Sequence, residues 1–338
     1  MSEYREILLT LARLHDLTRQ ESRRAFELMT SGAAGEAQIG ALLMGLAAKG
    51  TTVEELTGAA MVMREKALAI PTGGAEILDT CGTGGDVRHT FNISTAAALI
   101  AAACGVKIVK HGNRSASGRS GSADVLEKLG VPLELPPEKL KQSLDECNIC
   151  FAFARACHPA MKFVAPARQA LAIPTIFNLL GPLTNPGGAK LHLLGVFAPE
   201  WTERIALVLR ELGSRRAWVV HAEDGLDEVS TMSATRISEL KDGAVRTWTL
   251  SAGDLGLPTA KLADLQVAGV DEAAAALTDV LANKPGPRRD IAVLNAAAAL
   301  VIAGRAGDLP AGMALASGAL ESGAATKTLD GLRGGARK

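Results

Sequence analysis

The chain has 338 residues, more than one hydrophobic core usually holds, so we expect two lobes or a large domain with a small one appended. Lys plus Arg and Asp plus Glu both number 36, and this zero net charge excludes the global positive field of a nonspecific nucleic-acid-binding protein. Hydrophobic residues make up 48% and aromatic residues 3%, which predicts an aliphatic core of the kind formed by helices packed on a sheet.

The sequence contains no uninterrupted apolar stretch of about twenty residues, so no membrane span is predicted. Its five cysteines are an odd number in a long chain without a recognisable secretory leader. These features favour a reducing compartment, and we expect the protein to be cytoplasmic.

Residues 4–70 show apolar positions at helical spacing and no strand alternation. Thr18 with Glu21, and Thr52 with Glu55, have the spacing of capping boxes that open helices. This part of the chain is therefore predicted to be a small all-helical lobe.

Short apolar runs alternate with helical segments after residue 70. The expected strands are 77–79, 106–109, 150–153, 191–197 and 217–221, and the expected helices are 94–103, 124–129 and 201–212. This alternation predicts an α/β fold with a mostly parallel central sheet flanked by helices, which binds ligands at the carboxyl ends of its strands.

The predicted domain boundary lies near residue 70. We expect a helical N-terminal domain over residues 1–70 and an α/β domain over residues 71–338. Residues 159–185 interrupt the strand-helix alternation with a helix and a Pro-rich loop, and they are expected to join the helical domain.

Two long intervals lack acidic residues but keep basic ones. Residues 87–123 contain no Asp or Glu, where the average frequency would give about four, and residues 147–199 contain none where it would give about six. Burial alone would exclude Lys and Arg as well, so the retained cations favour anion binding over simple burial. Among them are Lys110, Arg114 and Arg168.

Acidic residues instead crowd one predicted loop after a strand: Glu223, Asp224, Asp227 and Glu228. Such crowding is costly unless the carboxylates are solvated or neutralised by a cation. Magnesium binds one or two carboxylates together with substrate phosphates, and Asp227 and Glu228 suit that role. A single exposed acidic turn is the alternative, and only the phosphate-binding motifs below argue against it.

The first of these motifs is DTCGTGGD, residues 79–86. Its glycines allow backbone N–H groups to converge on an anion without obstruction by a Cβ atom. Asn92, Ser94 and Thr95 follow at a predicted helix start, where free N–H groups favour a phosphate. One of the two hydroxyls is expected to cap the helix and the other to face a ligand.

The second motif is KHGNRSASGRSGSADVLEKLG, residues 110–130, in which cations alternate with Gly and Ser before a helix begins. Short polar residues between cations suit a loop that folds over a polyanion. A solvated linker is the alternative, but linkers of this length seldom lie between a strand and a helix of one sheet.

The ordered set GTGGD, NxST, KHGNR, GSADVLE, HPAM, FNLLGPLTNP and GLDE resembles the anthranilate phosphoribosyltransferases over essentially the whole chain. The resemblance implies a fold like that of the nucleoside phosphorylases and phosphoribosyltransferases, and a homodimer formed through the helical domain. It also implies transfer of 5-phosphoribosyl from phosphoribosyl pyrophosphate to the amine of anthranilate in tryptophan biosynthesis.

The resemblance also assigns site residues. Two magnesium ions would be held by Ser94, Asp227 and Glu228, and anthranilate would be bound by Gly82, Asn113 and Arg168, with His111 and His158 near its access route. The residues assigned to phosphoribosyl pyrophosphate are Gly82, Gly85, Asp86, Thr90, Asn92, Ile93, Ser94, Thr95, Lys110, His111, Gly112, Asn113, Arg114, Ser115, Ala116, Ser117, Gly118 and Ser122.

The chain departs from the family pattern at three positions. Ala172 stands where Gly is expected, Pro174 where Arg is expected, and Gly118 where Ser is common. The first two lie beside Arg168 and predict an altered local loop, whereas Gly118 removes one hydroxyl and adds flexibility.

The implied chemistry is attack of a neutral aromatic amine on C1 of the ribose, with Lys110, magnesium and backbone N–H groups stabilising the departing pyrophosphate. No general base is assigned. Two alternatives remain open at this point: a pyrimidine-nucleoside phosphorylase of the same fold class, and a noncatalytic homologue that binds nucleic acid through the basic groove. The acidic loop and Arg168 speak against the first, and the neutral overall charge against the second.

Overall fold

The structure is a computed structural model that describes residues 2–85, 88–115 and 120–334. Its centre is one sheet with the strand order β3-β2-β1-β4-β5-β6-β7. The strands are β1 (Leu78–Gly82), β2 (Ile108–Gly112), β3 (Ile149–Phe153), β4 (Leu191–Gly195), β5 (Arg216–Ala222), β6 (Thr235–Lys241) and β7 (Ala244–Leu250).

The strands β3, β2, β1, β4 and β5 pair in parallel, which confirms the prediction of a mostly parallel sheet. The sequence reading missed β6 and β7, which form an antiparallel hairpin at one edge. β7 has mostly exposed or half-exposed side chains, so it lacks a clear apolar alternation. The turn Asp242-Gly243, with φ of 51° and 77°, is the hairpin signal that could have revealed both strands.

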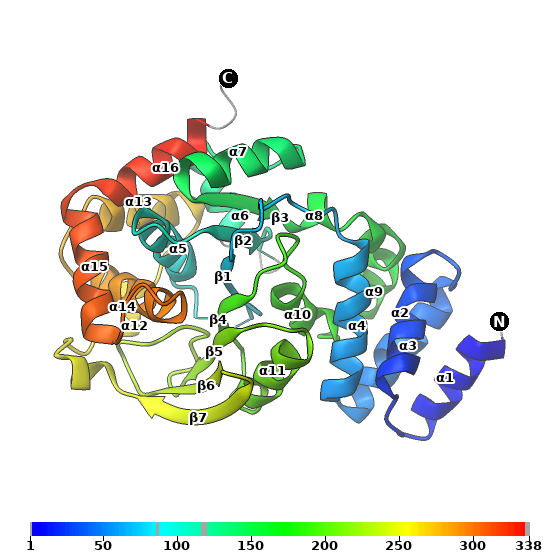
Figure 1. Cartoon of the computed structure of the whole chain (residues 1–338). Coiled ribbons are helices and arrows are strands. Elements are labelled where there is room, and N and C mark those ends of the chain that lie inside the picture. The colour runs from blue at the N-terminus through cyan, green and yellow to red at the C-terminus, as the bar shows by residue number, and fades with distance from the viewer. Residues whose placement is uncertain (1, 86–87, 116–119, 335–338) are drawn as a thin grey trace.

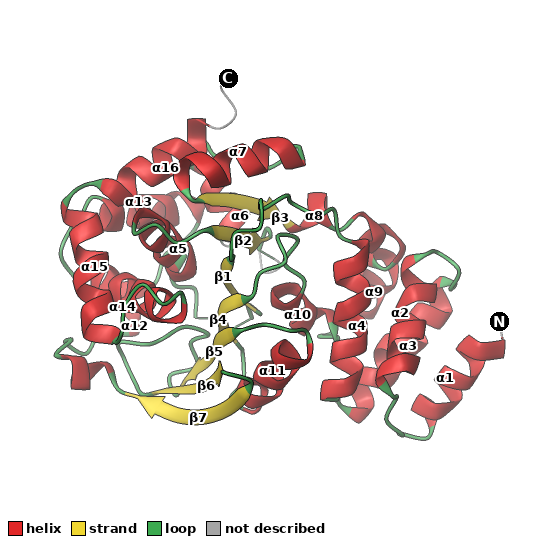
Figure 2. Ribbon diagram, in the orientation of Figure 1, coloured by secondary structure: helices red, strands yellow, loops and turns green. Residues whose placement is uncertain are grey.

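Helices cover both faces of the sheet, as Figures 1 and 2 show. One apolar cluster packs helices α5 and α13 to α16 against one face, and a second packs α11 and the N-terminal helices against the other. The helices of the α/β part include α5 (Ile93–Ala103), α6 (Ser122–Lys128), α7 (Pro137–Cys147), α11 (Glu200–Glu211), α12 (Leu262–Leu265), α13 (Val270–Leu281), α14 (Pro287–Ile302), α15 (Leu309–Glu321) and α16 (Ala324–Gly334).

The N-terminal part is helical, as predicted. Its helices are α1 (Ser2–Ala12), α2 (Arg19–Thr30), α3 (Glu36–Lys49) and α4 (Val53–Lys66). Both predicted capping boxes are present, at the starts of α2 and α4. Residues 159–185 supply short helices that share an apolar cluster with this bundle: α9 (Ala165–Leu171), α10 (Phe177–Leu180), and the 3-10 helices η1 (Pro159–Phe163) and η2 (Gly181–Leu183). The remaining short helices are α8 (Ala154–Cys157) and the 3-10 helix η3 (Ala252–Leu255).

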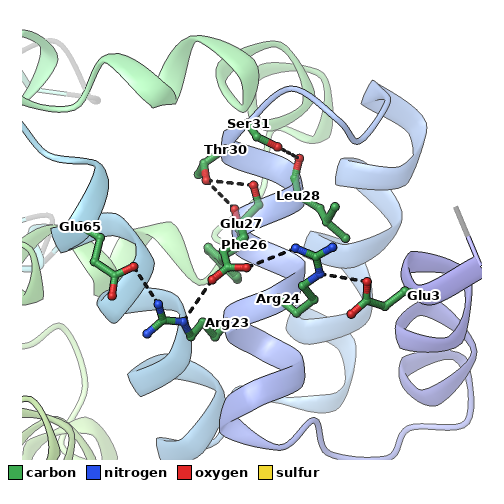
Figure 3. A network of polar contacts seen from close by, with 9 residues as sticks. All are labelled: Glu3, Arg23, Arg24, Phe26, Glu27, Leu28, Thr30, Ser31 and Glu65. Carbon is green, nitrogen blue, oxygen red and sulfur yellow. Dashed lines mark hydrogen bonds and ion pairs between the residues drawn. The ribbon is translucent and has the colours of Figure 1, made fainter.

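Ion pairs connect the helices of the bundle (Figure 3). Arg24 of α2 pairs with Glu3 of α1 at 2.9 Å, and Arg23 of α2 pairs with Glu65 of α4 at 3.0 Å. These side chains are partly exposed, so solvent screens the pairs and apolar packing holds the bundle together.

A buried cation, Arg64 of α4, connects the bundle to the α/β part. Its Nε donates to the carbonyl of Leu183 at 2.6 Å, and Nη1 donates to the carbonyl of Leu212 at 3.3 Å. Burial lowers the pKa of Arg64 to about 10. Both carbonyls lie at helix C-termini, where a cation is favourable. In the described part of the chain, no helix is both long enough and apolar enough to cross a membrane.

Helix α9 ends at Ala172 in the left-handed conformation, with φ of 51°. This conformation crowds Cβ against the backbone, and glycine is the usual residue there. The departure from the family pattern at Ala172 therefore keeps the helix end that a glycine would form, with some strain.

We predict that Ala172→Gly raises the free energy of unfolding by about 1 kcal/mol, because glycine relieves the left-handed strain. Urea denaturation at fixed protein concentration measures this change. The matched control Ala170→Gly lies inside α9 and is expected to lower stability by about 0.5–1 kcal/mol. Equal losses in both variants would contradict the strain at Ala172.

Candidate active site

The candidate site lies between β1 and β4, where the side on which successive strands join the sheet reverses. From β1 the chain adds β2 and β3 on one side, and it then returns to add β4 and β5 on the other. The two glycines that end the neighbouring strands, Gly82 of β1 and Gly195 of β4, are paired in register. Ligands bind at such a switch point, beyond the carboxyl ends of parallel strands.

The acidic loop between β5 and β6 is seated directly on these two glycines. A Cβ atom on Gly195 would lie 1.6 Å from the backbone oxygen of Asp227, and one on Gly82 would lie 2.6 Å from its carboxylate Oδ2. The N–H of Gly84 donates to this same Oδ2 at 3.2 Å. Only glycine at both strand ends allows the loop to approach so closely.

The start of α5 faces the second carboxylate of the loop. The backbone N–H of Ser94 donates to Glu228 Oε1 at 3.0 Å. The expectation that Ser94 or Thr95 caps this helix is wrong, because the N-cap residue is Asn92 and no side chain makes a cap bond. The buried Oδ1 of Asn92 and Oγ1 of Thr95 have no hydrogen-bond partner among the described residues. Two polar atoms at the start of α5 are therefore unsatisfied by the described part of the chain.

Lys110 lies in β2 and is 2% exposed. Its ammonium donates to the backbone oxygen of Thr80 at 2.7 Å and lies 3.3 Å from Ser94 Oγ. Among the described residues it forms no ion pair within 4.0 Å. Its contacts at hydrogen-bond distance are neutral, and the nearby Asp79 carboxyl is more than 4.0 Å away, so this arrangement favours binding of an anionic ligand.

The polar loop after β2 folds back on the start of α6. A Cβ atom on Gly112 would lie 2.3 Å from Ser122 Oγ, which brings these two predicted residues together. Arg114 instead turns toward α6, where it pairs with Asp124 at 2.9 Å and Glu127 at 2.7 Å. Its guanidinium is thus committed to carboxylates of the protein itself.

Asp79 of the first motif organises the middle of the sheet. Its Oδ1 accepts from the backbone N–H of His111 at 3.2 Å, and Oδ2 accepts from Asn185 Nδ2 at 2.7 Å. Burial raises the pKa of Asp79 to about 6, against the opposing effect of nearby Lys110. The first four residues of this motif, up to Gly82, are part of β1. Pairing with β4 extends the strand beyond the predicted residues 77–79.

Two histidines, His111 of β2 and His158, are in contact. His111 Nδ1 lies 3.0 Å from the carbonyl of Gly181, and its Nε2 lies 3.2 Å from His158 Nε2. A carbonyl only accepts, so His111 holds its proton on Nδ1 and His158 donates through Nε2. Burial lowers the pKa of His111 to about 3 and that of His158 to about 4. Both rings are neutral at pH 7.

Arg168 of α9 is half-buried, and its guanidinium lies over the ring of Phe177 at 5.0 Å. The guanidinium has no hydrogen bond or ion pair with another described residue, and burial lowers its pKa. No hydrogen bond joins it to Asn113 or Gly82 within the described ranges. Asn113 is exposed, and its side-chain oxygen accepts from the N–H of Arg114 at 2.8 Å.

The four carboxylates of the acidic loop divide by role. Asp224 serves the loop itself: its Oδ1 accepts from the N–H of Leu226 at 2.9 Å, and Oδ2 accepts from the hydroxyls of Ser230 and Ser233. Glu223 is exposed. Asp227 and Glu228, the pair that the sequence predicts to bind magnesium, accept hydrogen bonds from Gly84 after β1 and from Ser94 of α5.

The structure thus gathers most of the predicted residues near the carboxyl ends of the parallel strands. Gly85 has φ of +86° in the turn after β1, Thr90 bridges Gln266, and Ile93 is buried at the start of α5. Ser115 donates its N–H to Asp124 at 3.1 Å. Asp86, Ala116, Ser117 and Gly118 lie outside the described residues.

Sequence reasoning assigned no role to Asp79, Asn185, Gly195 or Asn295. Asp79 lies in DTCGTGGD and Asn185 lies in FNLLGPLTNP. The structure joins the two by a buried hydrogen bond. Asn295 is a lone amide in an Ala-rich segment, which is the signal that could have identified it.

Comparison with known proteins agrees with this architecture. Residues 5–67 match the helical bundle domain of the glycosyl transferase family, and residues 74–326 match its a/b domain. The fold and the site thus define a glycosyl transferase with a helical bundle and an α/β part.

Named relatives narrow this class. An anthranilate phosphoribosyltransferase of Rhodospirillum rubrum is 51% identical over 97% of this chain and 94% of its own, and one of Parvibaculum lavamentivorans is 49% identical over 97% and 96%. The crystal structure of the anthranilate phosphoribosyltransferase of Thermus thermophilus is 39% identical, covers 100% of both chains and superposes with a TM-score of 0.92. The chain belongs to the anthranilate phosphoribosyltransferase family.

A yeast member was solved in complex with phosphoribosyl pyrophosphate and magnesium. This Saccharomyces cerevisiae enzyme is 25% identical, covers 98% of this chain and 97% of its own, and superposes with a TM-score of 0.88.

The histidine pair predicts acid sensitivity. A histidine whose pKa is lowered in the folded state stabilises the protein above pH 6.5, and this stability is lost as pH falls toward the folded value. His158→Gln keeps an N–H donor but cannot titrate. Between pH 6.5 and 5, its free energy of unfolding should fall by about 1.5 kcal/mol less than that of the unsubstituted protein.

Urea denaturation at the two pH values measures this difference. His192, also buried with its pKa lowered to about 3, is the matched control outside the site, and His192→Gln should give a change of similar size. Identical pH dependence in the parent and His158→Gln would show that the pKa of His158 is the same in the folded and unfolded states, and would contradict the lowered pKa.

Proposed function

We propose that this protein transfers 5-phosphoribosyl from phosphoribosyl pyrophosphate to the amine of anthranilate, releases pyrophosphate, and serves tryptophan biosynthesis. The observation that carries the proposal is the cluster at the switch point, where Lys110, the start of α5, and the carboxylates of Asp227 and Glu228 converge. A buried cation and a helix N-terminus beside two carboxylates suit a polyphosphate bound with a metal ion. The names of the family members agree with this reaction.

We assign the phosphoribosyl pyrophosphate to the turn after β1, the start of α5 and the loop after β2. The unsatisfied Oδ1 of Asn92 and Oγ1 of Thr95 are available to it. Lys110 offers a buried positive charge. Arg114 contributes its backbone to this loop, because its guanidinium is already paired with Asp124 and Glu127.

Magnesium fits the donor set at the acidic loop. No three His, Cys, Asp or Glu side chains gather as a metal-binding group among the described residues. A pair of carboxylates suffices for magnesium, which completes its coordination with water and substrate phosphates. The solved yeast complex supports magnesium use. We propose two ions, held by Ser94, Asp227 and Glu228, and magnesium would neutralise charge on the departing pyrophosphate.

Anthranilate carries a carboxylate that matches Arg168. The guanidinium lies against the Phe177 ring and pairs with no carboxylate of the described residues, so it can form a bidentate pair with the substrate. We assign Gly82 and Asn113 to the same substrate, with His111 and His158 beside its access route. Neutral histidines place no second charge there.

The reaction forms a bond between the amine nitrogen and C1 of the ribose and breaks the bond from C1 to pyrophosphate. Lys110 and the N–H groups of the site stabilise charge that develops on the leaving group. The neutral aromatic amine attacks without prior deprotonation, and its proton leaves to solvent. We assign no general base.

We propose the domain division at residue 70, with residues 159–185 packed on the helical domain, and a homodimer formed through that domain. Exposed apolar side chains there, Leu14 at 65% and Met44 at 47% exposed, support a helical interface. We propose the cytoplasm as the compartment, supported by five cysteines that are all free.

The two alternatives find no support. The relatives reported above carry neither the name of a nucleoside phosphorylase nor that of a nucleic-acid-binding protein. The carboxylate pair at the switch point would repel a free phosphate ion or a nucleic-acid backbone in the absence of a metal.

The direct test is loss of anthranilate fluorescence after phosphoribosyl pyrophosphate is added in the presence of magnesium. We expect consumption that stops when EDTA is added and returns with excess magnesium. Incubation with thymidine and phosphate should leave both unchanged. Consumption of thymidine, or salt-sensitive DNA binding without turnover, would replace the proposal with one of the alternatives.

The same fluorescence assay tests the assignment of magnesium to Asp227 and Glu228. The double variant Asp227→Asn with Glu228→Gln keeps the size of both side chains and removes both charges. It should lose most turnover and its response to magnesium. Unchanged turnover and magnesium dependence would refute the assignment.

Arg168→Ala should raise the KM for anthranilate roughly 10- to 100-fold, because it removes a charge-assisted hydrogen-bonding pair, and should leave the KM for phosphoribosyl pyrophosphate nearly unchanged. Steady-state kinetics with each substrate varied separates the two effects. Arg155→Ala, an exposed cation of the same acid-free interval, is the matched control and should behave like the parent. An unchanged KM for anthranilate in Arg168→Ala would remove this residue from the substrate site.

A further inference from the structure

A buried asparagine in α14 forms hydrogen bonds with the backbone of the acidic loop. Asn295 is 0% exposed in a helix otherwise built of Ala, Leu, Val and Ile over its buried positions. Its Oδ1 accepts from the backbone N–H of Val229 at 3.0 Å, and its Nδ2 donates to the carbonyls of Val229 at 2.8 Å and Ile291 at 2.9 Å. The amide thus binds both backbone polar groups of one loop residue.

Val229 directly follows the carboxylate pair. The peptide bond between Glu228 and Val229 is planar, so a fixed N–H on Val229 also fixes the carbonyl plane of Glu228. On the other side of the pair, Leu226 is buried, and its N–H is bound by Asp224. Asp227 and Glu228 are therefore held between two anchored residues.

The amide is costly in such a place unless all its groups are paired. A buried side-chain amide loses its hydration, and an apolar residue would fill the same space in this helix without that loss. Besides the bond to Ile291 within its own helix, Asn295 forms two hydrogen bonds with Val229, which lies outside the strands of the sheet. Its chemistry is thus directed at the loop and not at the packing of α14.

We propose that Asn295 is a positioning residue that aims the carboxylates of Asp227 and Glu228 and thereby sets the affinity of this pair for a divalent cation. The inference rests on the proposed function, which assigns the cation to these two residues. Asn295 acts on the cation only through the loop backbone and touches neither cation nor substrate.

The test measures cation binding without turnover. Mn²⁺ is titrated into the full-length protein with saturating phosphoribosyl pyrophosphate and no anthranilate, and free Mn²⁺ is followed by electron paramagnetic resonance. Asn295→Ala should weaken Mn²⁺ binding about 10-fold, in the range seen when groups behind metal ligands are removed, whereas Leu294→Ala should change it by less than about 2-fold.

Leu294 is the matched control because it is equally buried in the same helix, and its truncation leaves a cavity without touching Val229. At saturating magnesium, Asn295→Ala should recover most of the parent kcat, because the reacting groups remain in place. Thermal unfolding shows whether each variant is folded at the assay temperature. If Asn295→Ala is not, Asn295→Ser is measured against the same expectation, since its short hydroxyl cannot bind both groups of Val229.

The outcomes separate the two proposals. If Asp227→Asn with Glu228→Gln binds Mn²⁺ as the parent does, the metal assignment fails. If that double variant loses Mn²⁺ while the Asn295 variants bind it as tightly as the parent, the positioning inference alone is overturned. Equal weakening in Leu294→Ala and Asn295→Ala would likewise overturn it, because the effect would then come from general destabilisation of α14.

Discussion

The site depends on the close approach of the acidic loop to the two strand ends at the switch point. Gly195 leaves no room for a Cβ atom beside the backbone of Asp227, and Gly82 leaves little beside its carboxylate. This approach carries Glu228 to the first N–H groups of α5. A side chain on Gly195 would displace the whole loop, and the carboxylates would then lose both their backbone donors and their position beside Lys110.

Charged groups of both signs gather around the start of α5. Lys110 is buried with carbonyl and hydroxyl neighbours, and Arg168 is stacked on an aromatic ring, so both positive groups have capacity for an anion. The carboxylates of Asp227 and Glu228 reach the turn after β1 and the start of α5, where Ser94 also neighbours Lys110. Substrates that carry phosphates, a metal ion and a carboxylate match these charges, which is the physical basis of the proposed reaction.

Most of the fold and much of the site could be predicted from the sequence. The parallel strands follow from apolar runs, and the phosphate-binding segments follow from glycines and cations in intervals without acids. The hairpin of β6 and β7 was missed because the mostly exposed strand β7 has no clear apolar alternation. The capping role expected of Ser94 or Thr95 was wrong because Asn92 precedes them in the N-cap position.

The sequence by itself determined what acts over a few residues: capping boxes, the acidic loop, and the glycines that allow left-handed turns. Only the tertiary structure decided which of these meet. Glu228 reaches Ser94 across 134 positions, and Asn295 reaches Val229 across 66. Such contacts depend on the order of strands in the sheet and on which face each helix covers, and local propensities carry no information about either.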